Sequence, residues 1–262
     1  MKNTVATLAA MKRNGEKISQ LTCYDYSTAK LIDAAGINMI LVGDSLGMTM
    51  QGYKDTLPVT VDEMIVYGRS VVRGCKETFV VVDMPFMSYQ ISVEQAMQNA
   101  GRIMKETGAS AVKLEGGKEV CPQIRAITAA GIPVVAHIGM TPQSVNAFGG
   151  FTVQGKGEAN ARRECVPPKL SALITKKLDI ITIGIGASPE CDAQVLVWQD
   201  MLGISDFKPK FAKHFAEVGE TMREAFRAYD GEVKSGVFPA SEHTFVKSDC
   251  TEEFLASLDV EY

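Results

Sequence analysis

The run Phe79–Asp83, with the sequence FVVVD, decides the fold: it is a short apolar stretch, rich in Val, that ends in an acidic residue. The same pattern recurs in Met39–Asp44 (MILVGD) and in Ala111–Glu115 (AVKLE). Continuous apolar runs of this length are typical of buried strands in a parallel sheet. Because the carboxyl ends of consecutive parallel strands lie at the same edge of the sheet, we expect the three carboxylates to converge there. Clustered carboxylate oxygens favour a hard cation, Mg²⁺ first, over zinc.

Strand-like and helix-like segments alternate along the chain. The strand-like runs are Ile18–Tyr24, Met39–Val42, Phe79–Val82, Ala111–Leu114, Pro133–Ile138 and Ile180–Ile185, and the helix-like segments include Ser27–Ala35, Val61–Gly74, Val93–Thr107 and Pro122–Ala130. This βαβα alternation, with no GxGxxG fingerprint after the first strand, predicts an α/β fold of the (β/α)₈ TIM-barrel type. We expect one domain over residues 1–262. Active sites of such barrels lie at the carboxyl ends of the strands, where the acidic residues stand.

The composition fits a cytoplasmic enzyme. The chain has 262 residues, of which 46% are hydrophobic and 22% charged, enough for one sizeable core. The net charge of −4 argues against nucleic acid or an anionic membrane as a partner. Its six cysteines are scattered without a CxxC pair, as expected for reduced thiols in the cytoplasm. No apolar stretch approaches the ~20 residues needed to span a bilayer, so we expect small-molecule substrates and no membrane partner.

Two further side chains are placed to join the acidic cluster. Lys113 and Glu115 lie two residues apart in one strand, so their side chains share a face and would line one pocket with a cation and an anion. His137 holds the corresponding position at the end of the fifth strand-like run. We expect it to donate a hydrogen bond to a carboxylate or carbonyl group of a substrate.

Each of these residues also has a purely structural interpretation. Asp44 is a suitable cap for the following helix, and Asp83 stands two residues before Pro85, where turn chemistry is common. Glu115 is equally compatible with a solvated loop, and His137 with a hydrogen-bonded core position. The repetition of polar residues at successive strand ends favours a shared site over these separate explanations.

A glycine-rich segment invites a different interpretation, which we reject. Residues 150–156 (GFTVQGK) match the start of a phosphate-binding GxxxxGK loop, but Gly157 stands where the motif requires Ser or Thr. The hydroxyl group that would hold Mg²⁺ is therefore missing. We interpret residues 148–157 instead as a flap near the site, because long loops are often functional.

Longer motifs identify the family. They are Gly43–Met48 (GDSLGM), Asp83–Tyr89 (DMPFMSY), Val112–Gly117 (VKLEGG), His137–Ser144 (HIGMTPQS) and Glu164–Pro167 (ECVP). In these motifs the chain resembles ketopantoate hydroxymethyltransferase, and the likeness extends over nearly its whole length. The resemblance implies a cytoplasmic enzyme of pantothenate biosynthesis, on the pathway to coenzyme A, that assembles as a homodecamer.

The resemblance also implies a reaction. A one-carbon unit passes from the cosubstrate 5,10-methylenetetrahydrofolate to 3-methyl-2-oxobutanoate, and with water this yields 2-dehydropantoate and tetrahydrofolate. Removal of a proton beside a ketone creates an enolate, whose charge a divalent cation stabilises as a Lewis acid.

The family's functional positions can be transferred residue by residue. They imply Mg²⁺ ligands at Asp44, Asp83 and Glu115, substrate contacts at Asp44, Ser45, Asp83 and Lys113, and a proton acceptor at Glu164. A carboxylate base works best when its pocket raises its pKa towards the operating pH. We assign His137 a catalytic role as a polarising or positioning group.

One departure from the family pattern is large. Only residues 158–163 lie between Gly157 and Glu164, where the family has a helix and a strand. An eight-stranded barrel that lacks one strand exposes two edges. Either the sequence omits residues of the protein, or the chain carries a deletion, or the barrel is rearranged. We favour omission because the motif at Glu164–Pro167 resumes in register.

Two other functions compete with the transferase. The first is a Mg²⁺-dependent lyase or mutase acting on 2-oxo acids or phosphoenolpyruvate, which would use the same barrel logic and acidic cluster. The second is a non-catalytic oligomeric scaffold, which follows if the segment before Glu164 is truly deleted. Fold analogy alone does not separate these functions.

Overall fold

The computed structural model describes residues 2–148, 166–206, 208–245 and 250–258. Its centre is one parallel sheet made of β1 (Ile18–Thr22), β2 (Met39–Val42), β3 (Phe79–Asp83), β4 (Ala111–Glu115), β5 (Val134–His137), β6 (Ile183–Gly184) and β7 (Ala193–Leu196). The strands follow the order β5-β4-β3-β2-β1-β7-β6, and every neighbouring pair is parallel. This is the strand order of a β/α barrel that is opened between β5 and β6.

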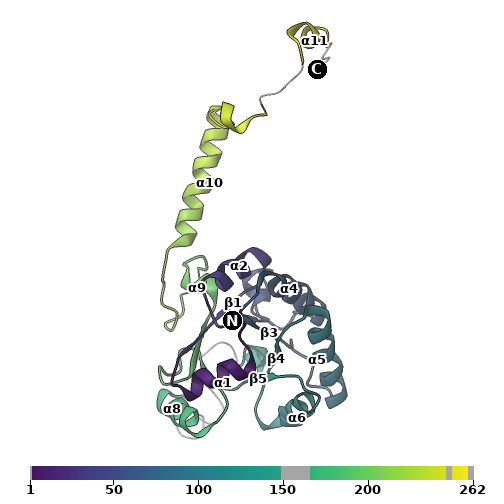
Figure 1. Cartoon of the computed structure of the whole chain (residues 1–262), viewed down its shortest axis with the longest axis vertical. Helices are drawn as coiled ribbons and strands as arrows, with labels where there is room; N and C mark the ends of the chain where they lie inside the picture. The colour runs from purple at the N-terminus through teal and green to yellow at the C-terminus, as the bar shows by residue number, and fades with distance from the viewer. Residues whose placement is uncertain (1, 149–165, 207, 246–249, 259–262) are drawn as a thin grey trace.

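Helices cover the outer side of the sheet. Those of the α/β body are α1 (Val5–Arg13), α2 (Tyr26–Ala34), α3 (Leu46–Thr49), α4 (Val61–Gly74), α5 (Val93–Thr107), α6 (Cys121–Ala129), α7 (Val145–Phe148), α8 (Pro168–Lys177) and α9 (Trp198–Met201), with short 3₁₀ turns at Lys118–Val120 and Pro142–Ser144. The helices α2, α4, α5 and α6 pack side by side along one flank of the sheet (Figure 1).

Local signals explain why two of these helices match the sequence-based prediction residue for residue. At the start of α4, Thr60 and Glu63 form a reciprocal capping box. The helix α5 begins after the cap Ser92, which accepts a hydrogen bond from the Gln95 amide, and it ends at Gly108 in the left-handed conformation. Boundaries with such signals can be predicted from sequence because the deciding contacts are local.

The two faces of the sheet have different environments. Alternate residues such as Val80, Val82 and Leu114 point outward into the larger apolar core beneath the helices. The residues between them point inward, where Phe79, Val81, Leu8, Ile18, Met39, Ala111 and Ala193 form a second apolar cluster. Leu8 comes from α1, so this helix closes the amino end of the curled sheet. The inward-facing positions that follow towards the carboxyl ends are polar.

The opening in the sheet coincides with the shortened segment. The strands β5 and β6 are the two edges of the sheet among the described residues, and they are joined by residues 138–182. The helix and strand expected before Glu164 belong in this interval. The sequence correctly predicted a barrel-type sheet, and the described residues form seven of its strands.

Beyond the α/β body the chain extends outward. The helix α10 (Val218–Ser235) projects away from the body and leads to a 3₁₀ turn at Ser241–His243 and to α11 (Glu252–Ala256) (Figure 1). Its only buried residue is Gly219. Within the described residues, no helix combines the length and the apolar character needed to cross a membrane.

Candidate active site

Strand register brings four of the predicted side chains to one place. Asp83 at the end of β3 pairs with Lys113 of β4, and Glu115 at the end of β4 pairs with His137 of β5. Paired residues of parallel strands share a face, and residues two apart in one strand also share it. All four therefore point into the curled sheet at its carboxyl end, directly beyond the inner apolar cluster.

Lys113 is the centre of this group. Its ammonium donates to Oδ1 of Asp83 at 2.8 Å and to Oδ2 at 2.9 Å, and it lies 3.4 Å from Oε1 of Glu115. The side chain is buried, with a residue exposure of 9%. A buried lysine of this kind is held by its carboxylate partners, because an unpaired charge is costly away from water.

Asp44 joins the group from the loop after β2. Its backbone amide donates to Oδ2 of Asp83 at 3.0 Å, and its own carboxylate is buried. The preceding Gly43 makes this approach possible, since an added Cβ there would lie 2.9 Å from Oγ of Ser45 and 3.5 Å from Oδ2 of Asp83. The helix-capping interpretation of Asp44 is wrong: the N-cap of α3 is Ser45, and no side chain caps that helix.

Ser45 lies at the edge of the same cluster. Its hydroxyl group shares a hydrogen bond of 2.8 Å with the phenol of Tyr24, in which either oxygen can be the donor. Burial raises the pKa of Tyr24 to about 12, so the phenol stays protonated at neutral pH. Ser45 is thereby held beside Asp83 by a neutral partner and remains free to orient a polar ligand.

His137 contacts Glu115 directly. The distance between Nδ1 of His137 and Oε1 of Glu115 is 2.8 Å. Glu115 is buried, which excludes the solvated-loop interpretation, whereas one quarter of the His137 side chain is exposed. The imidazole is therefore anchored at one nitrogen and is accessible enough for the rest of the ring to meet a ligand.

Two residues that the sequence analysis did not assign complete the network. Gln143, in the 3₁₀ turn after β5, donates from Nε2 to Oδ2 of Asp44 at 2.8 Å and from its backbone amide to Oε2 of Glu115 at 3.1 Å. The phenol oxygen of Tyr89 accepts from the Glu115 amide at 3.0 Å and lies 2.7 Å from Oε1 of Gln143. Both residues stand in the quoted family motifs, but no local pattern marks a buried amide or phenol as part of a site.

The electrostatics of the cluster are unequal. Burial and then repulsion from Asp83 raise the pKa of Asp44 well above its ordinary range. Burial also acts on Glu115, but the Lys113 ammonium and the His137 hydrogen bond outweigh it and lower the pKa to about 2. Burial opposes the charge of Lys113, whereas Asp83, Glu115 and Asp44 together raise its pKa above the ordinary value.

The cluster is short of positive charge. Among the described residues, the three carboxylates of Asp44, Asp83 and Glu115 surround the single ammonium of Lys113, so two negative charges stay uncompensated when all are ionised. This deficit equals the charge of one divalent cation, and the donors are the oxygen ligands that Mg²⁺ prefers. As they stand, no three His, Cys, Asp or Glu side chains in the described part of the chain form a group that could hold a metal. The carboxylates are joined through Lys113 and Gln143 instead.

Two predictions lie outside the described residues. Glu164, the expected proton acceptor, belongs to the stretch 149–165 that the structure does not describe. The flap predicted over residues 148–157 falls in the same stretch except for its first residue. The structure therefore brings together Asp44, Ser45, Asp83, Lys113, Glu115 and His137, and leaves the base and the flap as predictions.

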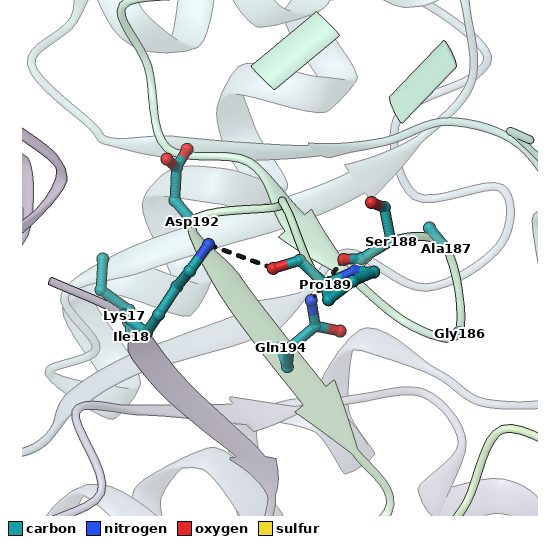
Figure 2. A pocket seen from close by; sticks show the side chains of 8 residues that line it. All are labelled: Lys17, Ile18, Gly186, Ala187, Ser188, Pro189, Asp192 and Gln194. Carbon is teal, nitrogen blue, oxygen red and sulfur yellow. Dashed lines mark hydrogen bonds between the residues drawn. The ribbon is translucent and has the colours of Figure 1, made fainter. Parts of the chain in front are cut away.

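A separate cavity of about 440 Å³ lies away from this cluster, near the first residues of β1 and β7. Figure 2 shows Lys17 at its wall, reaching towards the loop around Pro189. Its ammonium donates to the backbone carbonyls of Pro189, Glu190 and Cys191. These contacts tie the β6–β7 loop to β1 and engage the Lys17 ammonium.

The fold places the chain in a class, the α/β-barrel proteins, whose enzymes carry their active centres at the carboxyl ends of the strands, where the polar cluster lies. The family model for ketopantoate hydroxymethyltransferase matches residues 2–164 and 162–241. This chain belongs to that family.

Close relatives agree with the assignment. The chain is 59% identical to the 3-methyl-2-oxobutanoate hydroxymethyltransferase of Clostridium novyi (strain NT), over 94% of this chain and 96% of the relative. It is 57% identical to the enzyme of the same name from Enterococcus faecalis (strain ATCC 700802 / V583), over 95% and 98%. The chain is therefore an enzyme of this type, and the assignment rests on sequence identity as well as on the fold.

Solved structures support the fold. Phosphonopyruvate hydrolase in complex with oxalate and Mg²⁺ has a TM-score of 0.57 at 12% identity, covering 92% of this chain and 93% of the other. A 2,3-dimethylmalate lyase, a member of the PEP mutase/isocitrate lyase superfamily, has a TM-score of 0.56 at 14% identity, covering 98% and 91%. At such identities the likeness concerns the barrel-like architecture alone.

The comparisons also locate the shortened segment. The two matched stretches of the family model meet at residues 162–164, directly at the predicted break. The alignment with the Clostridium novyi relative is 264 residues long, longer than the whole chain, although it includes only 94% of it. The relative therefore carries residues that have no counterpart in this sequence.

Proposed function

We propose that this chain moves a one-carbon unit from 5,10-methylenetetrahydrofolate to 3-methyl-2-oxobutanoate, with water, to form 2-dehydropantoate and tetrahydrofolate. The observation that carries the proposal is the cluster of three buried carboxylates around Lys113 at the carboxyl ends of β2, β3 and β4. It stands in a chain 59% identical to an enzyme named for this keto acid.

The proposed Mg²⁺ ligands are Asp44, Asp83 and Glu115. Their oxygen chemistry and the two uncompensated charges fit a divalent cation. When bound, Mg²⁺ would supply Lewis-acid stabilisation of the charge that develops on the keto oxygen.

The remaining roles follow from position and charge. Lys113 offsets the carboxylate of the keto acid, and Ser45 orients the substrate with neighbouring backbone amides. His137 polarises or positions the substrate while it is anchored to Glu115. Glu164 takes the proton from C3, and the resulting carbon nucleophile forms a bond to the methylene carbon of the folate. Both bonds from this carbon to the folate nitrogens break, water supplies the hydroxyl group of the product, and the two nitrogens take up the proton from C3 and one proton from water. This role of Glu164 rests on the family motif.

The same proposal includes the assembly and the cell compartment. We propose a single-domain cytoplasmic protein that forms a homodecamer. Supporting an oligomer, α10 exposes Met222, Phe226, Tyr229 and Val233, which recur at helical spacing along one stripe. An exposed apolar stripe of this kind on a projecting helix is typical of a contact between chains. Size-exclusion chromatography with light scattering measures the assembly directly: a mass near ten chains is expected, and a monomer contradicts it.

Proton exchange tests the chemistry. In D₂O with Mg²⁺ and without folate, the C3 proton signal of 3-methyl-2-oxobutanoate should disappear with time. The loss should stop in Glu164→Gln and continue in Glu16→Gln, a control at an exposed site. No exchange despite intact metal binding would favour the scaffold. Cleavage of another 2-oxo acid would favour the lyase or mutase.

The shortened segment needs its own measurement. Intact mass spectrometry of the protein isolated from its source decides whether the chain holds more residues than the sequence gives. A larger mass supports omission and a complete barrel. A mass equal to that of 262 residues means a true deletion, and exchange activity of that chain then decides between enzyme and scaffold.

A further inference from the structure

Gln143 contacts several members of the polar cluster, and no function has yet been assigned to it. It lies in the 3₁₀ turn Pro142–Ser144 and is 5% exposed. Its Nε2 donates to Oδ2 of Asp44 at 2.8 Å and to the carbonyl of Met84 at 3.0 Å. Its Oε1 lies 2.7 Å from the phenol oxygen of Tyr89 and accepts from Nε2 of Gln90 at 3.3 Å.

These contacts determine the orientation of the amide. A rotated amide would place its oxygen against the Asp44 carboxylate and the Met84 carbonyl, which are both acceptors. It would also direct its NH₂ group at Gln90, whose own NH₂ is a donor. Gln143 is therefore held in one orientation, with its donor end directed at Asp44.

The backbone of the same residue holds a second carboxylate. The Gln143 amide donates to Oε2 of Glu115 at 3.1 Å, while Oε1 of Glu115 faces His137 and Lys113. Asp44 is bound differently, because Gln143 reaches only its Oδ2, and no described residue donates to its Oδ1. One residue thus orients two carboxylates, one from the loop after β2 and one from β4, and leaves one oxygen of Asp44 available.

We propose that Gln143 is a positioning residue that limits how far the Asp44 and Glu115 carboxylates must move to bind a divalent cation. This inference rests on the proposed metal site. Groups that hold metal ligands from behind commonly contribute about 10–100-fold to metal affinity, because they remove the freedom of the ligands to turn away. The long separation in sequence, with Gln143 99 residues from Asp44, makes this bridge a property of the folded chain only.

The test measures metal binding rather than activity. In Gln143→Met the side chain keeps its length but loses its hydrogen bonds, while the backbone contact to Glu115 remains. We expect the dissociation constant for Mn²⁺, measured on the full chain from the electron paramagnetic resonance signal of the free ion, to rise about 10-fold or more. If Gln143→Met does not fold, Gln143→Asn replaces it, because its shorter side chain keeps the amide but cannot reach Asp44.

A buried glutamine elsewhere supplies the matched control. Gln123 of α6 is 8% exposed and donates to the carbonyl of Tyr89 at 3.3 Å, without touching a carboxylate. Gln123→Leu should lower the melting temperature and leave Mn²⁺ affinity within about twofold of the unchanged chain. If Gln143→Met and Gln143→Asn also lowered the melting temperature but left the Mn²⁺ affinity within about twofold, Gln143 would be only a structural residue and the inference would be wrong. Absence of Mn²⁺ binding in the unchanged chain would overturn the proposed metal site itself.

Discussion

The ammonium of Lys113 lies 2.8 Å from one carboxylate oxygen of Asp83 and 2.9 Å from the other. This two-fold contact joins the end of β3 to the middle of β4, where the register pairs the two residues. The contact places the Lys113 ammonium, the single ammonium group of the cluster among the described residues, against Asp83, one of the proposed metal ligands. The balance between Lys113, the three carboxylates and a divalent cation therefore governs both stability and binding.

The substitution Lys113→Met tests that balance. Without metal, the variant should lose about 3–5 kcal/mol of unfolding free energy, because the buried carboxylates lose their counter-ion. Added Mg²⁺ should raise its melting temperature by more than that of the unchanged chain, since the cation replaces the missing charge. Binding of 3-methyl-2-oxobutanoate should weaken. Thermal unfolding with and without Mg²⁺, and calorimetric titration of the keto acid, provide the measurements.

Lys12→Met is the matched control for that experiment. Lys12 of α1 donates to Asp192 at 2.7 Å near the amino end of the sheet, away from the cluster. Its loss should lower stability without changing the response to Mg²⁺. A Lys113→Met protein that responds to Mg²⁺ no more than Lys12→Met would contradict the proposed charge balance.

The affinity for Mg²⁺ should rise with pH. Burial and repulsion from Asp83 raise the pKa of Asp44, so in the metal-free protein a proton competes for this carboxylate. Metal binding requires the ionised form and therefore releases the proton. Calorimetric titrations in two buffers of different ionisation enthalpy should show this release. Equal apparent enthalpies in both buffers would mean that Asp44 is already ionised.

Gly43→Ala should damage activity more than stability. The new methyl group would lie 2.9 Å from Oγ of Ser45 and 3.5 Å from Oδ2 of Asp83, so Ser45 must move. A misplacement of about 1 Å in a substrate-positioning group can cost about 100-fold in rate, so we expect a loss of up to this size. The exchange assay at C3 measures the loss.

A second glycine provides the comparison. Gly101 lies within α5 and has nothing within 4 Å of an added Cβ. Gly101→Ala should keep full exchange activity and gain about 0.5–1 kcal/mol of stability from its higher helix propensity. If Gly43→Ala also exchanged at the normal rate, the contact between Ser45 and the substrate would be wrong.

Acid should destabilise the chain partly through Asp33 of α2. Some burial raises its pKa, but the amides of Glu77, Lys76 and Thr78 and the Thr78 hydroxyl group outweigh this and lower it below the ordinary 3.8. A carboxylate whose pKa is lower in the folded state than in the unfolded state stabilises the fold at a pH above the unfolded-state pKa. This contribution disappears as the pH falls through the folded-state pKa. Asp33→Asn should therefore be less stable at pH ~7 and lose less stability towards pH ~3. Urea unfolding of both chains across this pH range measures the difference. If the unfolding free energies of the two chains changed in parallel with pH, the role of Asp33 would be disproved.

Much of the fold could be predicted because its signals are local. The apolar runs identified five strands, and the caps at Thr60 and Ser92 located two helices. The strand β7, by contrast, was missed, since Ala193–Leu196 contains Gln194 and is not a continuous apolar run. Its strand character comes from pairing with β1, in which Ile18 pairs with Ala193, 175 positions later in sequence. The predicted run Ile180–Ile185 shrank to two paired residues, because β6 is an edge strand that pairs only with β7 among the described residues.

The candidate site divides in the same way. The sequence by itself determined that acidic residues end three successive strands and that Lys113 and Glu115 share a face, because strand periodicity and parallel pairing require it. Only the tertiary structure decided that Lys113 lies between Asp83 and Glu115 and that Gln143 bridges Asp44 and Glu115. Apart from the pair Lys113 and Glu115, these contacts join residues 28 to 99 positions apart, so they form only when the sheet curls and buries its charged groups together.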